Sequence, residues 1–128
     1  MGLREVSAIL WRERHLLELL LFKLIERRHL LAAGETRFLS YAEAEVDRAL
    51  ERAQLAELRR SLFIHDLGSE LGARVEDLTL TTLTSDSPEP FRTIFIEHRR
   101  AFCELAAEIE DEGLTVPSLA DFCTGRSA

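Results

Sequence analysis

The fold of this chain is decided by residues 3–31, which read LREVSAILWRERHLLELLLFKLIERRHLL. The stretch has neither proline nor glycine, and apolar residues recur along it at heptad spacing, with Glu13 and Arg27 as exceptions. This pattern predicts a long helix packed along a narrow apolar seam. Gly34 is expected just beyond its end, because glycine readily adopts a positive φ. The seam consists of Leu3, Val6, Leu10, Glu13, Leu17, Leu20, Leu24, Arg27 and Leu31.

A second helix is expected to begin near Thr36, with alanines along its seam. Alanine side chains let a neighbouring helix approach closely, so they suit a position opposite the leucines of the first helix. Because only two or three residues separate the helices, they are predicted to form an antiparallel hairpin on the order of 40 Å long, at 1.5 Å per residue. The second seam reads Leu39, Ala42, Val46, Ala49, Ala53, Ala56, Arg60 and Phe63.

The rest of the chain predicts short helical turns and a third long helix. Residues 63–72 are expected to continue or restart the second helix, with breaks at Gly68 and Gly72, and residues 74–84 to form a helical turn and a loop. Ser85-Asp86-Ser87-Pro88 has the composition of a helix start and predicts a third helix over residues 88–112, closed by Gly113. We therefore expect an all-α protein: a three-helix bundle over residues 1–112 and a loosely ordered tail over residues 113–128.

Composition and charge exclude several classes of protein. The 128 residues are 46% hydrophobic and 30% charged, which is typical of a globular domain. A net charge of −7 argues against nucleic-acid binding, which depends on basic side chains at phosphates. No apolar run approaches the roughly 20 residues of a membrane-spanning helix. The absence of a signal peptide, and two cysteines interpreted as reduced thiols, predict a cytoplasmic protein without membrane insertion.

No catalytic, cofactor or metal site is expected. Glu26-x-x-His29 has the spacing of a di-iron motif, but such a site needs a second copy of the motif and two further inward-facing glutamates on other helices. The sequence also lacks a glycine-rich phosphate loop, a Cys-x-x-Cys pair and a His-Glu-x-x-His motif. We therefore expect a protein that is not an enzyme.

The expected third helix carries the candidate partner-binding residues. Its aromatic and aliphatic face either completes the core of the bundle or lines a groove for an amphipathic helix of another protein. Acidic residues near the end of the same helix oppose the helix dipole, which favours contact with a basic partner. The candidate residues are Phe91, Phe95, Phe102, Leu105 and Ile109 on the apolar face, with Glu108, Glu110 and Asp111 in the acidic run.

Two segments of the chain resemble a known family. Residues 6–24, VSAILWRERHLLELLLFKL, are similar to the opening helix of FlgN-type flagellar export chaperones in their actinobacterial-like form. Residues 91–102, FRTIFIEHRRAF, resemble the start of that family's last helix, and residues 43–46 and 55–60 are compatible with its second helix. The last helix of the family continues for several more turns, whereas here Gly113 ends it, so the C-terminus is divergent or shortened.

The resemblance implies a cytoplasmic, non-enzymatic chaperone for the hook–filament junction proteins of the flagellum. Members of the family bind these hook-associated proteins, typically through a C-terminal amphipathic helix of the client, before type III export. The sequence is also compatible with a different class of protein, a self-associating coiled-coil protein whose surplus leucines form a homodimer.

Overall fold

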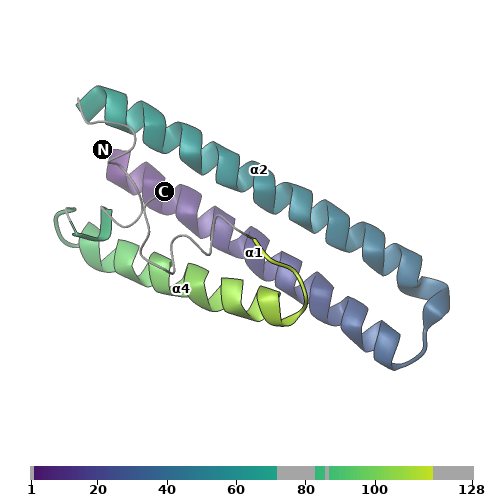
Figure 1. Cartoon of the computed structure of the whole chain (residues 1–128). Coiled ribbons are helices and arrows are strands. Elements are labelled where there is room, and N and C mark those ends of the chain that lie inside the picture. Colours follow the sequence, from purple (N-terminus) through teal and green to yellow (C-terminus); the bar gives the residue numbers. More distant parts are fainter. Residues whose placement is uncertain (1, 72–82, 86, 117–128) are drawn as a thin grey trace.

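The computed structural model describes residues 2–71, 83–85 and 87–116 and is helical throughout its regular elements (Figure 1). Helix α1 spans Gly2–Ala32, and a short 3₁₀ helix, η1, spans Thr36–Phe38. Helix α2 spans Leu39–Leu71 and α4 spans Phe91–Asp111. The expectation of an all-α fold with three long helices is confirmed.

Helix α1 is the central element, with α2 along one side and α4 along another (Figure 1). Helices α1 and α2 are antiparallel, as Glu13 meets Arg60 while Arg27 meets Glu43. Helix α4 runs parallel to α1, since Ser7 lies by His98 and Arg28 by Glu112. Few contacts join α2 to α4 among the described residues, so α1 supplies the packing surface for both.

The core lies along the two surfaces of α1 that face α2 and α4. The predicted seams supply most of the buried residues of the hairpin, with leucines on α1 and small residues on α2. Close packing of large against small side chains brings the two helices together. The core cluster contains Val6, Leu10, Leu17, Leu20 and Leu24 of α1, Val46, Ala49, Ala53, Ile64 and Leu67 of α2, and Leu83, Phe95, Phe102, Leu105 and Ile109.

The turn between α1 and α2 lies at the predicted glycine. Gly34 adopts a φ of +71°, and the amide of Glu35 donates to the carbonyl of Leu30 at 2.9 Å. This closure satisfies a carbonyl at the end of α1 and reverses the chain direction. The predicted antiparallel hairpin is therefore confirmed.

The helix boundaries differ from the sequence prediction at three places. Helix α2 begins at Leu39, after the 3₁₀ helix η1, rather than near Thr36. Helix α2 continues through Gly68 to Leu71, so the predicted break at Gly68 is wrong; a glycine inside a helix costs only about 1 kcal/mol. Helix α4 begins at Phe91 rather than Pro88, with Pro90 at its N-cap. The reason is Pro90 itself, because a proline disfavours helical backbone in the residue before it. The Glu89 carboxylate instead accepts from the amide of Thr93 at 2.9 Å.

The C-terminal end of α4 follows the prediction. Gly113 has a φ of +93°, and the amide of Leu114 donates to the carbonyl of Ile109 at 3.3 Å, a glycine closure of the last turn. Leu114 and Val116 pack against the core, so the first residues of the expected tail are attached to the domain. Residues 117–128, and most of the helical turn expected within residues 74–84, lie outside the described residues.

The cysteine expectation needs a correction. Cys103, on α4, is half-buried and disulfide-bonded rather than a reduced thiol. Cys123 lies outside the described residues.

Candidate protein-binding surface

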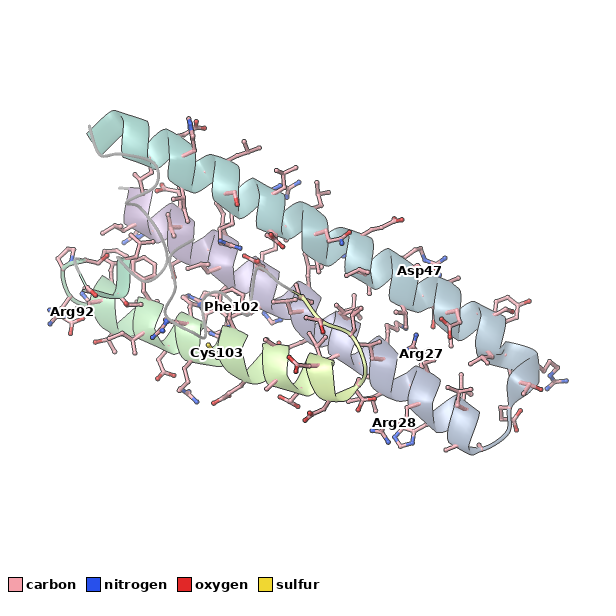
Figure 2. All side chains as sticks on the ribbon, in the orientation of Figure 1. Arg27, Arg28, Asp47, Arg92, Phe102 and Cys103 are labelled. Carbon is pink, nitrogen blue, oxygen red and sulfur yellow. The ribbon has the colours of Figure 1, made fainter. Side chains whose placement is uncertain are left out.

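The apolar face of α4 lies in the core of the domain. Phe95, Phe102 and Ile109 are completely buried and Leu105 nearly so. Phe91 is half-buried and stacks on Phe95 with ring centroids 6.3 Å apart. Figure 2 shows Phe102 between α4 and α1. Because α4 buries this face mainly against α1, the structure selects the core interpretation over the groove interpretation.

The acidic run at the end of α4 is exposed. Glu108, Glu110 and Asp111 face solvent, whereas the neighbouring Glu112 pairs with Arg28 at 2.9 Å and ties the end of α4 to α1. The three exposed carboxylates therefore form a surface separate from the buried aromatic residues with which the sequence grouped them.

A buried histidine joins α4 to the first half of α1. The Nδ1 atom of His98 lies 3.3 Å from a guanidinium nitrogen of Arg14, and its Nε2 atom lies 3.3 Å from Ser7 Oγ. A guanidinium only donates hydrogen bonds, so Nδ1 accepts and Nε2–H donates to the hydroxyl. The indole of Trp11 packs edge to face with the imidazole, and the two ring centroids are 5.1 Å apart. Burial, aided by the charge of Arg14, lowers the pKa of His98 from 6.5 to about 4, which keeps the ring neutral.

Two open pockets lie next to each other between α1 and α2 and share Arg52, and we call them together the groove; none of the described residues of α4 lines it. Its apolar lining comes from both helices, and basic side chains border it. Towards the N-terminal half of α1 the lining residues are Arg12, Leu16, Arg52, Leu55, Ala56 and Arg59. Towards the hairpin turn they are Leu19, Lys23, Glu45, Arg48, Ala49 and Arg52.

A stripe of exposed leucines runs along α2, and its first member, Leu55, lines this groove. Leu55, Leu58 and Leu62 are each more than half exposed, and their spacing of three and four residues places them on one face of the helix. Single exposed leucines are ordinary, but several on one face of a helix are typical of a surface that binds another protein. We call Leu55, Leu58 and Leu62 the leucine stripe.

The sequence contained a signal for the leucine stripe that the first interpretation missed. Its three positions follow helical spacing on the second helix but lie off the alanine seam. A second apolar stripe beside a complete seam indicates a second contact surface. The aromatic residues of the third helix gave a stronger signal, because large apolar side chains dominate both cores and interfaces.

Other classes of site find no support among the described residues. No three histidine, cysteine, aspartate or glutamate side chains in residues 2–71, 83–85 and 87–116 come together as metal ligands. None of the helices in the same ranges is both long and apolar enough to cross a membrane. Comparisons of the chain with protein-family models, curated proteins and solved structures found no match.

Proposed function

We propose that this protein is an export chaperone that binds an amphipathic helix of a client protein on the α1–α2 hairpin. The observation that carries the proposal is the leucine stripe, three large apolar side chains left in solvent on α2, of which Leu55 also lines the open groove. The contact surface differs from the α4 face expected from the sequence, because that face is used for folding.

The energetics suit a reversible complex. Full burial of a leucine is worth about 1.5–3 kcal/mol, and the three stripe residues already hide part of their surface in the free protein. Their combined gain must offset the loss of translational and rotational freedom on association. A partner helix with apolar residues at three- and four-residue spacing would supply the matching face.

The resemblance of residues 6–24 and 91–102 to FlgN-type chaperones supplies the class of client. It points to the hook-associated proteins of the hook–filament junction, held through a C-terminal amphipathic helix in the cytoplasm before type III export. The resembling segments belong to α1 and α4, whereas the leucine stripe lies on α2.

Isothermal titration of the full chain with the C-terminal segments of the hook-associated proteins from the same genome tests the proposal. We expect binding that the double variant Leu55→Asp, Leu62→Asp abolishes while helical content by circular dichroism stays unchanged. Ile96→Asp, at an exposed apolar residue on α4, is the matched control and should bind as the parent does. The titration is run with and without a reducing agent because Cys103 is disulfide-bonded. Absence of binding in both conditions would refute the client assignment.

The leucine stripe also supports a second candidate, self-association through α2 as a helical homodimer. Light scattering coupled to size exclusion separates the two, since the chain alone has a mass of 14.6 kDa. A mass twice as large that Leu55→Asp, Leu62→Asp returns to 14.6 kDa would favour the dimer. A monomer that binds the client segment would favour the chaperone.

A further inference from the structure

Four arginines on the α1–α2 groove have no acidic partner among the described residues. They are Arg12 on α1 and Arg48, Arg52 and Arg59 on α2, and all four line the groove. Arg48, Arg52 and Arg59 follow one another at spacings of four and seven residues, which places them on one face of α2. The groove therefore carries a line of uncompensated positive charge.

Three other cations of α1, by contrast, pair with carboxylates. Lys23 pairs with Glu26 and Glu45, so the one carboxylate that lines the groove is already engaged. Arg27 pairs with Glu43 and Arg28 with Glu112. In a chain of net charge −7, acidic side chains are plentiful, yet none of those described pairs with these four arginines.

The lining between the arginines is apolar. Leu16 and Leu19 of α1, with Leu55 and Ala56 of α2, lie between the charged groups. A ligand that fits the groove must therefore present apolar surface in its middle and negative charge at its margins. Along α2, the distance from Arg48 to Arg59 is about 16 Å at 1.5 Å per residue, which is three helical turns.

From this arrangement we propose that the groove binds an acidic amphipathic helix of a partner protein, with aspartate or glutamate side chains pairing with Arg12, Arg48, Arg52 and Arg59. The inference rests on the proposed function and adds the sign of charge that selects the partner. This sign is opposite to the one expected from the acidic run of α4. Arginine suits the role because its planar guanidinium binds a carboxylate through two parallel hydrogen bonds.

A protein helix fits the groove better than a nucleic acid does. Phosphates would use the arginines but leave Leu16, Leu55 and Ala56 without a partner, and the overall charge of −7 repels a polyanion. An acidic amphipathic helix uses both the charged margins and the apolar lining.

The test uses two designed 21-residue helical peptides with the same leucines, one with glutamate and the other with lysine at the flanking positions. Fluorescence anisotropy with the full chain is expected to show at least tenfold tighter binding of the glutamate peptide, with a preference that declines as salt is raised. The variant Arg52→Glu, Arg59→Glu should reverse the preference, so that the lysine peptide binds more tightly than the glutamate peptide. The neutral variant Arg52→Gln, Arg59→Gln should weaken binding of the glutamate peptide without creating binding of the lysine peptide.

Arg4→Glu is the matched control, because Arg4 is exposed on α1 and lines neither part of the groove. This variant should still bind the glutamate peptide more tightly than the lysine peptide. Circular dichroism of every variant checks that the helical content is retained, so that loss of binding is not loss of fold.

Several outcomes would overturn the inference. Equal affinity for the two peptides, no binding of either, or an order unaffected by Arg52→Glu, Arg59→Glu would each do so. Displacement of the glutamate peptide by an unstructured oligonucleotide would reassign the groove to nucleic acid. Salt-sensitive self-association lost in the same variant would reassign it to the acidic surface of a second copy. If the hook-associated segments bind the parent and the charge-reversed variant equally, the proposed function stands and the groove inference falls.

Discussion

Glu13 of α1 and Arg60 of α2 form a buried ion pair across the hairpin, with Arg60 Nε donating to Glu13 Oε1 at 2.7 Å. Both are almost fully buried. Each is a polar residue on a predominantly apolar seam. Burial raises the pKa of Glu13, and the Arg60 guanidinium offsets part of that effect. The pair fixes the register of the hairpin, because a shift of either helix would break a buried ion pair.

Removing one partner of this pair should destabilise the protein strongly. We expect Arg60→Met or Glu13→Leu alone to lower the free energy of unfolding by about 3–5 kcal/mol, because each breaks a buried ion pair while one of its charges stays in the core. The double variant should recover most of the loss, since it leaves neither charge. Urea unfolding of the four proteins as a double-mutant cycle measures the coupling. Additive losses would contradict the assignment.

Acid should destabilise the domain through His98. Its pKa is lowered to about 4 in the folded protein from an ordinary 6.5. Between these pH values the histidine is protonated in the unfolded chain but neutral in the folded protein. The free energy of unfolding should therefore fall as the pH decreases from about 6.5 towards about 4.

His98→Gln should flatten the pH dependence in this window, measured by urea unfolding at several pH values. His15→Gln, at an exposed histidine of α1, should retain the slope of the parent. An unchanged slope in His98→Gln would show that other groups cause the acid sensitivity.

The aromatic face of α4 should behave as core in a stability measurement. Phe95→Ala and Phe102→Ala should each cost about 3–5 kcal/mol, through lost burial and the cavity left behind. Leu58→Ala, at an exposed residue, should change stability by less than about 0.5 kcal/mol. Small losses in both phenylalanine variants would return these residues to a surface role.

Gly34 should resist substitution for a backbone reason alone. Its φ of +71° lies in the left-handed region, and nothing lies within 4 Å of the position a Cβ would take. Gly34→Ala should therefore destabilise the hairpin by roughly 1–2 kcal/mol through backbone strain. Gly34→Asn should cost less, because asparagine tolerates this conformation. A thermal melt compares the three proteins, and equal midpoints would contradict the assignment.

Local patterns in the sequence predicted the helices and the hairpin because they depend on neighbours along the chain. The heptad seam of residues 3–31, the alanine seam after Thr36 and the short connection at Gly34 each restrict the local structure without reference to distant residues. The start of α4 was misplaced because the Pro88 signal outweighed the constraint that Pro90 puts on the residue before it.

The sequence by itself determined the long helices, the antiparallel hairpin and the glycine turns that follow α1 and α4. The tertiary structure decided how polar residues pair and which apolar faces are covered. Glu13 pairs with Arg60, which lies forty-seven residues further along the chain. Phe95 and Phe102 of α4 are buried because α4 packs on α1. Periodicity reveals that a face is apolar, but it is equally satisfied by folding or by binding. Only the packing of α4 on α1 separated the core residues from the leucine stripe and the arginine-lined groove.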